Sequence, residues 1–293
     1  MYVDIFGKKR QKIGLHIHTT RSDGAASPDE ALKIYKEAGY DAVALTDHWL
    51  HNDAGEADGL GILSGAEYNI GGNDTLGGVY HILGLLVERD PEVLKSDGAQ
   101  TIINKIHAAG GIAVLAHPAW SLNTPDMIMK LDGIDATEIY NAVSAVGESF
   151  RADSSIIVDM LAVRGVIYPL LATDDTHFYN GKDNCVAYIM AECDTPDGKE
   201  IKKAILEKRF YATQGPEIHL TREDGKFTVR CSPVSHIYFA SGSAWCRRSF
   251  HGEKLTFAEY KPISTDRFVR AFVIDGEGRY AWSNIISVDE ADA

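Results

Sequence analysis

Histidines and carboxylates recur in this sequence at spacings that could bind metal ions. His16 and His18 stand two residues apart in the segment IGLHIH, and Asp175 and His177 have the same spacing in YPLLATDDTH. Residues two apart in an extended strand point to the same side, so the members of each pair can face one ion. Nitrogen and oxygen ligands without thiolate suit Zn, Mn or Fe. The two pairs therefore predict a metal site.

Five more residues of these types stand at or near the ends of other apolar segments. In folds that alternate strands and helices, ligands bind at the C-terminal ends of the strands. Burying nine such groups without ligands would be costly, and divalent ions remove that cost because the groups then become ligands. Nine ligands exceed what one ion can use, which indicates two or three divalent ions. The five further candidates are Asp23, His48, Glu67, His81 and His117.

The elements that must position these residues alternate between short apolar strands and amphipathic helices up to residue 214. One helix has a clear start, because Ser27, Pro28 and Glu30 form the pattern of a capping box with proline at the first helical position. This alternation predicts an α/β fold, either a barrel or an open sheet. Strands are expected at 13–18, 41–48, 79–87, 112–118, 136–142, 168–177 and 186–192, with another ending near Glu67. Helices are expected from Ser27 to Gly39 and at 98–111, 149–164 and 201–208.

The pattern changes after Gly215 and Pro216. Short alternating strands follow, such as KFTVRC, HIYFAS and RFVRAFVID, with no helical period between them. This pattern predicts a small all-β unit of about 75 residues that resembles a sandwich. We therefore expect two domains, a metal-binding α/β domain at residues 1–214 and an all-β domain at residues 215–293.

The charge of the chain limits its partners. Lysine and arginine total 29 against 42 aspartates and glutamates, which gives a formal net charge of −13 over 293 residues. A surface this acidic repels phosphate backbones and anionic lipids, so we expect neither non-specific nucleic-acid binding nor membrane binding. No segment reaches the ~20 apolar residues of a membrane helix, and the four cysteines form no C-x-x-C pair. We predict a cytoplasmic protein with reduced cysteines.

The ligand-bearing motifs, taken together and in this order, resemble those of the PHP superfamily, named for polymerase and histidinol phosphatase. The resemblance implies a distorted seven-stranded β/α barrel with two or three metal ions at its C-terminal mouth. The all-β tail with YAWSN further resembles the CehA/McbA-type metallohydrolase branch. The motifs are HIHTTRSDG (16–24), TDH (46–48), GAE (65–67), His81, AHP (116–118) and DTH (175–177). Carried over position by position, the ligands are His16, His18, Asp23, His48, Glu67, His81, His117, Asp175 and His177.

The resemblance and the ligand chemistry imply a metal-dependent hydrolase of phosphate esters. Divalent ions lower the pKa of bound water, and the resulting metal-activated hydroxide can attack phosphorus. Asp175 or His177 is the candidate proton donor to the leaving group, and Arg21 is the candidate cation that holds the phosphate. The expected substrate is a small phosphomonoester or phosphodiester, including nucleotide-like ones. The ligand set leaves Mn, Fe and Zn open.

Two other functions stay open at this point. A metal-activated hydroxide also attacks carbonyl carbon, so the same centre could serve a carbamate, amide or ester hydrolase. A non-catalytic structural or regulatory PHP module is the second alternative, although such modules typically lose ligands and here every position is filled. The sequence does not indicate the oligomeric state. Residues near the motifs with open roles are Asp47 and Glu138 (orienting imidazoles or bonding backbone), Lys182 (a second cation) and Trp49 (stacking on substrate or packing under a loop).

Overall fold

The computed structural model describes residues 2–72, 78–245 and 247–289, and its strands form two sheets. The smaller sheet has five strands in the order β10-β9-β8-β7-β6. β8, β9 and β10 run parallel, whereas β7 is antiparallel to both of its neighbours. The C-terminal ends of three neighbouring strands therefore lie at one edge of this sheet. Its strands are β6 (Gly65–Ile70), β7 (Tyr80–Leu85), β8 (Ile112–Leu115), β9 (Ala136–Asn141) and β10 (Leu170–Thr173).

The larger sheet has thirteen strands and runs from the N-terminal to the C-terminal part of the chain. Its main path is β13-β14-β16-β17-β12-β11-β2-β3-β5-β4, and β1, β15 and β18 pair with members of this path. Its first strands are β1 (Tyr2–Val3), β2 (Lys9–Gly14), β3 (Ala42–Ala44), β4 (Gly55–Ala57) and β5 (Leu60–Leu63). The others are β11 (Tyr188–Ala191), β12 (Phe210–Thr213), β13 (Ile218–Glu223), β14 (Lys226–Ser241), β15 (Ser249–Tyr260), β16 (Phe268–Ile274), β17 (Tyr280–Trp282) and β18 (Ile286–Ser287).

The predicted α/β class is confirmed, but the strands of the described ranges do not close into the predicted seven-stranded barrel. In the described ranges, isolated bridges join segments of the two sheets between Ile17 and Thr176, His48 and Glu67, and Asn52 and Gly65. Beside these bridges, Trp49 and Asp175 have φ angles of 58° and 52°. Those angles lie in the left-handed region, outside strand geometry. The barrel expectation is corrected to two sheets joined by isolated bridges in place of a continuous ladder.

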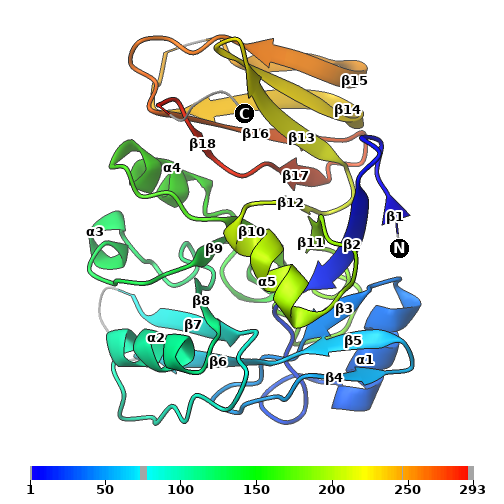
Figure 1. Ribbon diagram of the computed structural model, residues 1–293, viewed down its shortest axis with the longest axis vertical. Coiled ribbons are helices and arrows are strands. Elements are labelled where there is room, and N and C mark those ends of the chain that lie inside the picture. Colours follow the sequence, from blue (N-terminus) through cyan, green and yellow to red (C-terminus); the bar gives the residue numbers. More distant parts are fainter. Residues whose placement is uncertain (1, 73–77, 246, 290–293) are drawn as a thin grey trace.

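Helices cover the sheets, and the first of them begins as predicted (Figure 1). The hydroxyl of Ser27 accepts a hydrogen bond from the backbone N–H of Glu30, whose carboxylate accepts one from the N–H of Ser27. The helix expected at 149–164 begins only at Ser155, after a short π-helix. Within the described ranges, no helix is long and apolar enough to cross a membrane. The helices are α1 (Pro28–Glu37), α2 (Ala99–Ala108), α3 (Pro125–Ile128), η1 (Ser144–Glu148, the π-helix), α4 (Ser155–Val163) and α5 (Gly198–Leu206).

The largest apolar core draws side chains from both sheets. Ile13 of the larger sheet and Val114 and Leu171 of the smaller sheet belong to one cluster and are at most 1% exposed. Strands that are covered on both faces read as continuous apolar runs, which is why these segments were recognisable in the sequence. The core therefore fixes the strand ends that carry the histidines and carboxylates.

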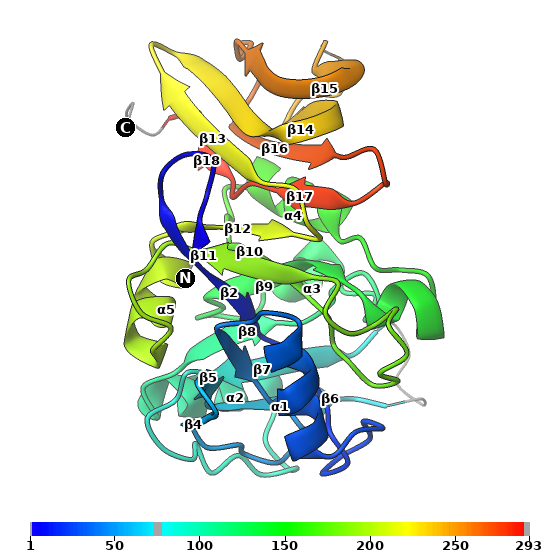
Figure 2. The same cartoon turned by 90° about the vertical axis from the view of Figure 1, so that its right-hand side faces the viewer.

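The C-terminal strands β13 to β18 lie at one end of the molecule, and β6 and β7 lie toward the other (Figures 1 and 2). β12 hydrogen-bonds to β11 on one side and to β17 on the other, so the ladder continues into the C-terminal strands. Stacked aromatic rings also connect the C-terminal strands with the smaller sheet. The ring centroid of Trp282 lies 5.3 Å from that of Tyr140 in β9 and 5.5 Å from that of Tyr280. The division of the chain at residues 214 and 215 stays a prediction.

One buried ion pair also joins α4 to the C-terminal strands. Arg270 of β16 is 2% exposed, and its Nε and Nη2 atoms lie 2.7 and 2.9 Å from the two carboxylate oxygens of Asp159. Such two-point, charge-assisted contacts are among the stronger hydrogen bonds in proteins. Nη1 of Arg270 has no hydrogen-bond partner among the residues that the structure describes. Asp159 is therefore the main compensation for this buried positive charge.

Candidate metal centre

His16 and His18 follow the end of β2 and are completely buried. Their Nε2 atoms lie 3.1 Å apart, as the two-residue spacing predicts for side chains on one side of an extended segment. The intervening Ile17 forms a bridge with Thr176, which brings this segment beside Asp175. The backbone of two elements therefore aims the predicted ligand pairs at the same space.

Glu67 of β6 and Asp175 after β10 complete a first group of donors with these histidines. Oδ1 of Asp175 lies 3.1 Å from the Nε2 atoms of both His16 and His18. Oε2 of Glu67 lies 3.1 Å from Nε2 of His18 and 3.4 Å from Nε2 of His16. All four residues are buried.

A second group shares Glu67 and adds His81 and His117. The other carboxylate oxygen, Oε1, lies 2.9 Å from Nδ1 of His81 and 3.3 Å from Nε2 of His117. His117 follows β8 and His81 stands in β7, so neighbouring strands of the smaller sheet supply this group. Glu67 thus presents one oxygen to each of two groups.

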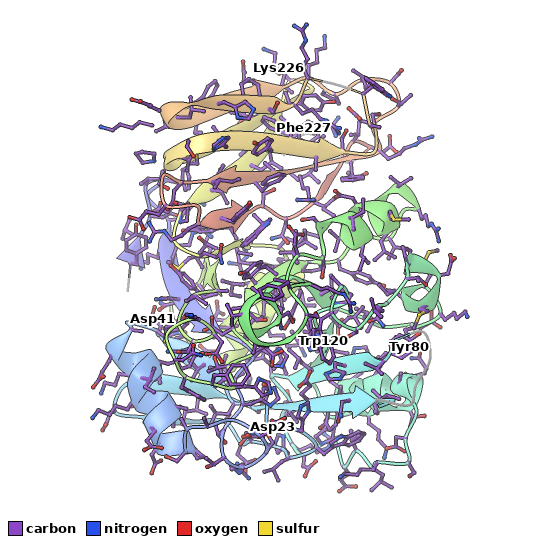
Figure 3. All side chains as sticks on the ribbon, turned by 180° about the vertical axis from the view of Figure 1, so that it is seen from behind. Asp23, Asp41, Tyr80, Trp120, Lys226 and Phe227 are labelled. Carbon is purple, nitrogen blue, oxygen red and sulfur yellow. The ribbon has the colours of Figure 1, made fainter. Side chains whose placement is uncertain are left out.

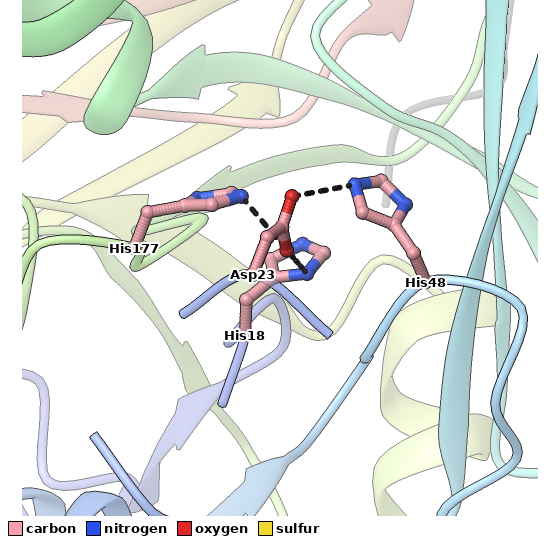
Figure 4. Close-up of side chains that lie close together, drawn as sticks. All are labelled: His18, Asp23, His48 and His177. Carbon is pink, nitrogen blue, oxygen red and sulfur yellow. Dashed lines mark ion pairs between the residues drawn. The ribbon is translucent and has the colours of Figure 1, made fainter. Parts of the chain in front are cut away.

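A third group shares His18 and reaches the surface (Figure 4). Oδ1 of Asp23 lies 3.4 Å from Nδ1 of His18 and 3.5 Å from Nε2 of His177. Its Oδ2 lies 3.6 Å from Nε2 of His48. The side chain of Asp23 is 52% exposed, whereas that of His18 is fully buried. This group therefore marks the open side of the centre.

The donor geometry fits divalent metal ions. Two ligands of one ion that each lie about 2.1 Å from it are separated by about 3.0–3.4 Å, depending on coordination geometry. The four donors of the first group meet this requirement, with separations of 3.1–3.4 Å. In addition, within the described residues no hydrogen bond of regular geometry reaches the buried Oδ1 of Asp175, although the Nε2 atoms of His16 and His18 lie 3.1 Å away. A buried oxygen of this kind needs a cation or a donor, and an ion would supply the former.

All nine predicted ligands therefore lie in three overlapping groups, whose donor atoms are within 4.8 Å of one another. The chain brings them together from six strands, because Glu67 lies within β6, His81 lies near the start of β7, and the other seven follow β2, β3, β8 and β10. Their binding of metal stays a prediction. The groups are His16, His18, Glu67 and Asp175; Glu67, His81 and His117; and His18, Asp23, His48 and His177.

Without metal ions, these buried groups shift one another's pKa values. Burial alone would lower the pKa of His16, but the carboxylates around it, led by Asp175, raise it to about 10. Burial likewise disfavours the charged form of His18, while hydrogen bonds with carboxylates raise its pKa well above the usual value. Burial would raise the pKa values of Glu67 and Asp175, yet the positive charge of His16 lowers both. Protons and metal ions therefore compete for the same atoms.

This competition predicts a pH dependence that a chelator should reveal. With metal removed, the raised histidine pKa values stabilise the fold below about pH 6.5, and this contribution is lost as pH rises toward 10. The lowered carboxylate pKa values stabilise the fold above about pH 4, and this contribution is lost as the pH falls further. The melting temperature of the chelated protein should thus fall as the pH is raised from 6 to 9. The metal-loaded protein should not, because metal binding strengthens as imidazoles deprotonate. Parallel melting profiles with and without chelator would contradict the centre.

Glu138 of β9 anchors two of the histidines. Its Oε1 lies 2.7 Å from Nδ1 of His16, and its Oε2 accepts a hydrogen bond from the backbone N–H of His117. The bond to Nδ1 leaves Nε2 of His16 facing the first group, as a metal ligand requires. The predicted orienting role of Glu138 therefore has a contact to support it.

Replacing Glu138 by Gln should weaken metal binding by about 10- to 100-fold, because the amide cannot hold the imidazole as the carboxylate does. Competition with a coloured chelator would measure this affinity. The matched control is Glu217→Gln, which changes a buried glutamate that hydrogen-bonds the backbone N–H of Ile5 away from the histidines. Equal affinities for both variants would rule out the orienting role.

Asp47 contacts a loop in place of an imidazole. Among the described residues, it accepts hydrogen bonds from the backbone N–H of Thr19 at 2.8 Å and from the hydroxyl of Ser22 at 3.0 Å. These bonds shape the loop that carries Asp23. These contacts support the alternative in which Asp47 bonds backbone and positions this loop.

Two polar residues at the centre were not singled out from the sequence. The amide of Asn141 donates hydrogen bonds to Oδ2 of Asp175 at 3.0 Å and to Glu138 at 2.9 Å. The completely buried Asp183 accepts bonds from the backbone N–H groups of His177 and Phe178. Asn141 ends a predicted strand, the signal that marked the ligands. Asp183 follows the DTH motif by several residues, and no spacing rule would have found it.

The predicted catalytic residues differ in how their contacts constrain them. Nδ1 of His177 lies 2.7 Å from the backbone carbonyl of Asp175, so it donates there and leaves Nε2 as the free nitrogen. Arg21 is exposed, and its guanidinium hydrogen-bonds Asn52 in the loop after β3. Trp49 hydrogen-bonds Asn69, which supports the packing alternative. Its ring lies 5.6 Å from that of Tyr68. Lys182 is exposed in the loop after His177.

The chain is similar in sequence to one known protein and similar in fold to a solved structure. No family model matches the sequence. The uncharacterized protein MJ1587 of Methanocaldococcus jannaschii is 30% identical over 172 residues, which cover 54% of this chain and 93% of that protein. A two-domain protein from Bacteroides vulgatus, described as containing a predicted PHP-like metal-dependent phosphoesterase, has a TM-score of 0.54 at 13% identity. The match covers 98% of this chain and 97% of that one, and it establishes a shared fold.

A looser structural match is a lesion-specific endonuclease from Pyrococcus furiosus. Its TM-score is 0.42 at 19% identity, over 68% of this chain and 56% of that one. A superposition this loose adds nothing to the argument about this chain.

Proposed function

Because this chain belongs to the family of the Methanocaldococcus jannaschii protein and has the fold of a PHP-like protein, we propose that it is a metal-dependent hydrolase of phosphate esters. The observation that carries the proposal is the convergence of nine imidazoles and carboxylates in three overlapping groups. The cofactors would be two or three divalent ions of Mn, Fe or Zn, which these ligands suit. The substrate would be a small phosphomonoester or phosphodiester, with the protein acting in the cytoplasm.

In this proposal, the chain positions every reactive group. His16, Glu67 and Asp175 would hold ions in the buried part of the centre, and Asp23 would hold one at its open side. When bound, the ions lower the pKa of coordinated water and offset negative charge on the phosphate oxygens. Arg21, anchored by Asn52 beside Asp23, would supply a fixed cation to a phosphate at the mouth.

The fate of the proton follows from the contacts of His177. Hydrolysis forms a bond between a water oxygen and phosphorus, breaks the ester P–O bond and transfers a proton to the leaving oxygen. Nδ1 of His177 is committed to the backbone carbonyl of Asp175, so only Nε2 can exchange a proton or bind metal. Asp23 raises the pKa of His177 above its usual value, although burial opposes the shift. His177 is therefore the proposed proton donor in a state in which its Nε2 is not bound to metal, whereas Oδ1 of Asp175 faces the Nε2 atoms of His16 and His18 and would hold metal.

The decisive experiment combines metal analysis with phosphate release. Purified protein should contain two or three equivalents of Mn, Fe or Zn. It should also release phosphate from at least one small phosphomonoester, or release the alcohol from at least one small phosphodiester. Arg21→Ala should keep the metal and raise KM about tenfold or more, because it removes a charge-assisted contact to phosphate. The matched control is Arg89→Ala, another exposed arginine, which hydrogen-bonds the carbonyl of Ala108. Full metal loading without hydrolysis of any phosphate ester would defeat the proposal.

A carbamate, amide or ester hydrolase is the second candidate, and a specific observation favours it. Phe178, whose ring centroid lies 6.4 Å from that of His177, is 45% exposed, and an apolar group beside the centre suits an uncharged substrate. Parallel assays with 4-nitrophenyl phosphate and 4-nitrophenyl acetate separate the two functions. Hydrolysis of the acetate alone, lost on chelation, would select the second candidate. A metal-free, inactive protein would instead select a non-catalytic module.

A further inference from the structure

Exposed apolar side chains gather on one side of the candidate metal centre. They lie in the loops after β8, β9 and β10, whose C-terminal ends share one edge because the three strands are parallel neighbours. Water-exposed apolar groups collected beside a site commonly mark a binding surface. We call these residues the apolar rim, and they are the exposed Leu122, Val146, Phe150 and Phe178 together with Trp120, which is partly buried.

The rim is continuous because its three loops contact one another. The backbone N–H of Ala119 donates a hydrogen bond to the hydroxyl of Ser154, which joins the first loop to the second. Gly147 of the π-helix lies against the ring of Phe178, which joins the second loop to the third. π-helical turns are rare and recur at functional sites. The three loops that carry these side chains therefore lie beside one another.

The two ends of the rim touch the candidate ligands. The Trp120 ring lies 5.0 Å from the ring of His117 and 5.3 Å from that of His81. The ring of Phe178 lies 6.4 Å from that of His177. Figure 3 shows Trp120 and Asp23 in the part of the molecule opposite the end that carries Phe227. A substrate with its phosphate at the centre would therefore have its remaining part against these rings.

Phe178 is held in place from three sides. Its backbone N–H and that of His177 both donate to Asp183, and the next residue, Tyr179, donates its hydroxyl to the carbonyl of His18. A Cβ atom on Gly147 would lie 2.3 Å from Cε2 of Phe178, so the absence of a side chain there is what lets the ring rest on the π-helix. The ring is nevertheless 45% exposed. A fixed, half-exposed ring beside a reactive centre can stack on a flat partner at little entropic cost.

We propose that the apolar rim, through Phe178, binds an aromatic leaving group, so that the preferred substrates are phosphate esters of phenol-like alcohols. This inference rests on the proposed function and names its substrate class. Oδ1 of Asp23 lies 3.5 Å from Nε2 of His177, the residue before Phe178, and Arg21 stands two positions before Asp23, so a phosphate bound at this open side would lie close to the ring. Hydrolysis would form the water O–P bond, break the aryl O–P bond and release the phenol with a proton taken from the water.

Binding of two phosphonates to the metal-loaded protein tests the inference without catalysis. Phenylphosphonate and methylphosphonate share the anion, cannot be hydrolysed, and differ in the ring. Titration calorimetry should show the wild type binding phenylphosphonate about tenfold more tightly, the effect of one good aromatic contact. Phe178→Ala should remove most of this preference while keeping the metal content. Phe257→Ala, which removes a 50% exposed ring from β15 at the other end of the molecule, should keep the preference.

Gly147→Ala provides an independent variant that leaves Phe178 in the chain. The added methyl group would displace the ring, so this variant should also lose the preference for phenylphosphonate. An unchanged preference in Phe178→Ala, or no preference in the wild type, overturns the inference. The proposed function can fail while the inference about binding holds. This is the outcome if the protein prefers phenylphosphonate but hydrolyses neither phenyl phosphate nor glycerol 2-phosphate. A ratio of kcat/KM for these two esters that falls in Phe178→Ala would support both.

Discussion

Glu67→Gln should reduce metal-dependent activity more than the loss of a residue that only orients a metal ligand. Glu67 gives one oxygen to the group of His16 and His18 and the other to the group of His81 and His117. An amide offers one acceptor oxygen and no charge, so one group loses its shared ligand. The first group also loses one of its two negative charges, and the second loses its only one. We expect a fall in kcat/KM of roughly a thousandfold, which is larger than the ~10- to 100-fold effect typical of residues that only orient a metal ligand.

Metal content and rate should fall together in this variant. Elemental analysis should find at least one equivalent fewer than in the wild type, with the folded state checked by circular dichroism. The control is again Glu217→Gln, a buried glutamate outside the three groups. A Glu67→Gln protein with full metal and more than a tenth of the wild-type rate would show that Glu67 does not bridge the groups.

Asp159→Ala should cause the largest loss of stability among single substitutions outside the metal centre. It would leave the guanidinium of Arg270 buried without a counter-charge, and Nη1 of that residue already lacks a hydrogen-bond partner within the described part of the chain. Breaking a buried pair from one side costs about 3–5 kcal/mol. We expect the lower end of that range, because the side chain of Asp159 is 23% exposed and water can reach the site. Urea unfolding would measure the loss.

Two further variants separate the burial effect from the loss of an ordinary ion pair. Asp126→Ala removes an exposed partner of Arg164 and should cost less than about 1 kcal/mol. The double replacement Asp159→Leu with Arg270→Met removes both buried charges and should recover most of the stability lost in Asp159→Ala. If Asp159→Ala costs no more than Asp126→Ala, the pair does not hold α4 to β16.

The ligand set could be predicted from the sequence because its signal is local. His16-x-His18 and Asp175-x-His177 follow the two-residue period of an extended chain, and the structure brings them within 3.1 Å of each other. The remaining candidates stand at strand ends, and the position of strand ends follows from apolar runs that the core buries. The start of α1 was equally local, because Ser27 and Glu30 cap each other.

Other features depended on contacts that no local pattern encodes. The two sheets are joined by isolated bridges beside Trp49 and Asp175, whose positive φ angles are revealed only in the folded chain. Asn141 reaches Asp175 because the ladder between β9 and β10 shifts register between Leu171 and Ala172. The ring contact of Phe178 with Gly147 joins loops after two different strands. Such features require the three-dimensional arrangement.

The path of the larger sheet has a consequence for how the chain acquires its fold during synthesis. β2 pairs with β11 near residue 190, and β12 pairs with β17 near residue 281. At roughly 5–20 residues per second, β2 would wait about 9–35 s for that partner, and the metal ligands would stay divided for a similar time. Non-local pairing of this kind also slows folding itself. The nascent chain therefore presents an unpaired strand edge for many seconds, and that interval is when aggregation competes with folding.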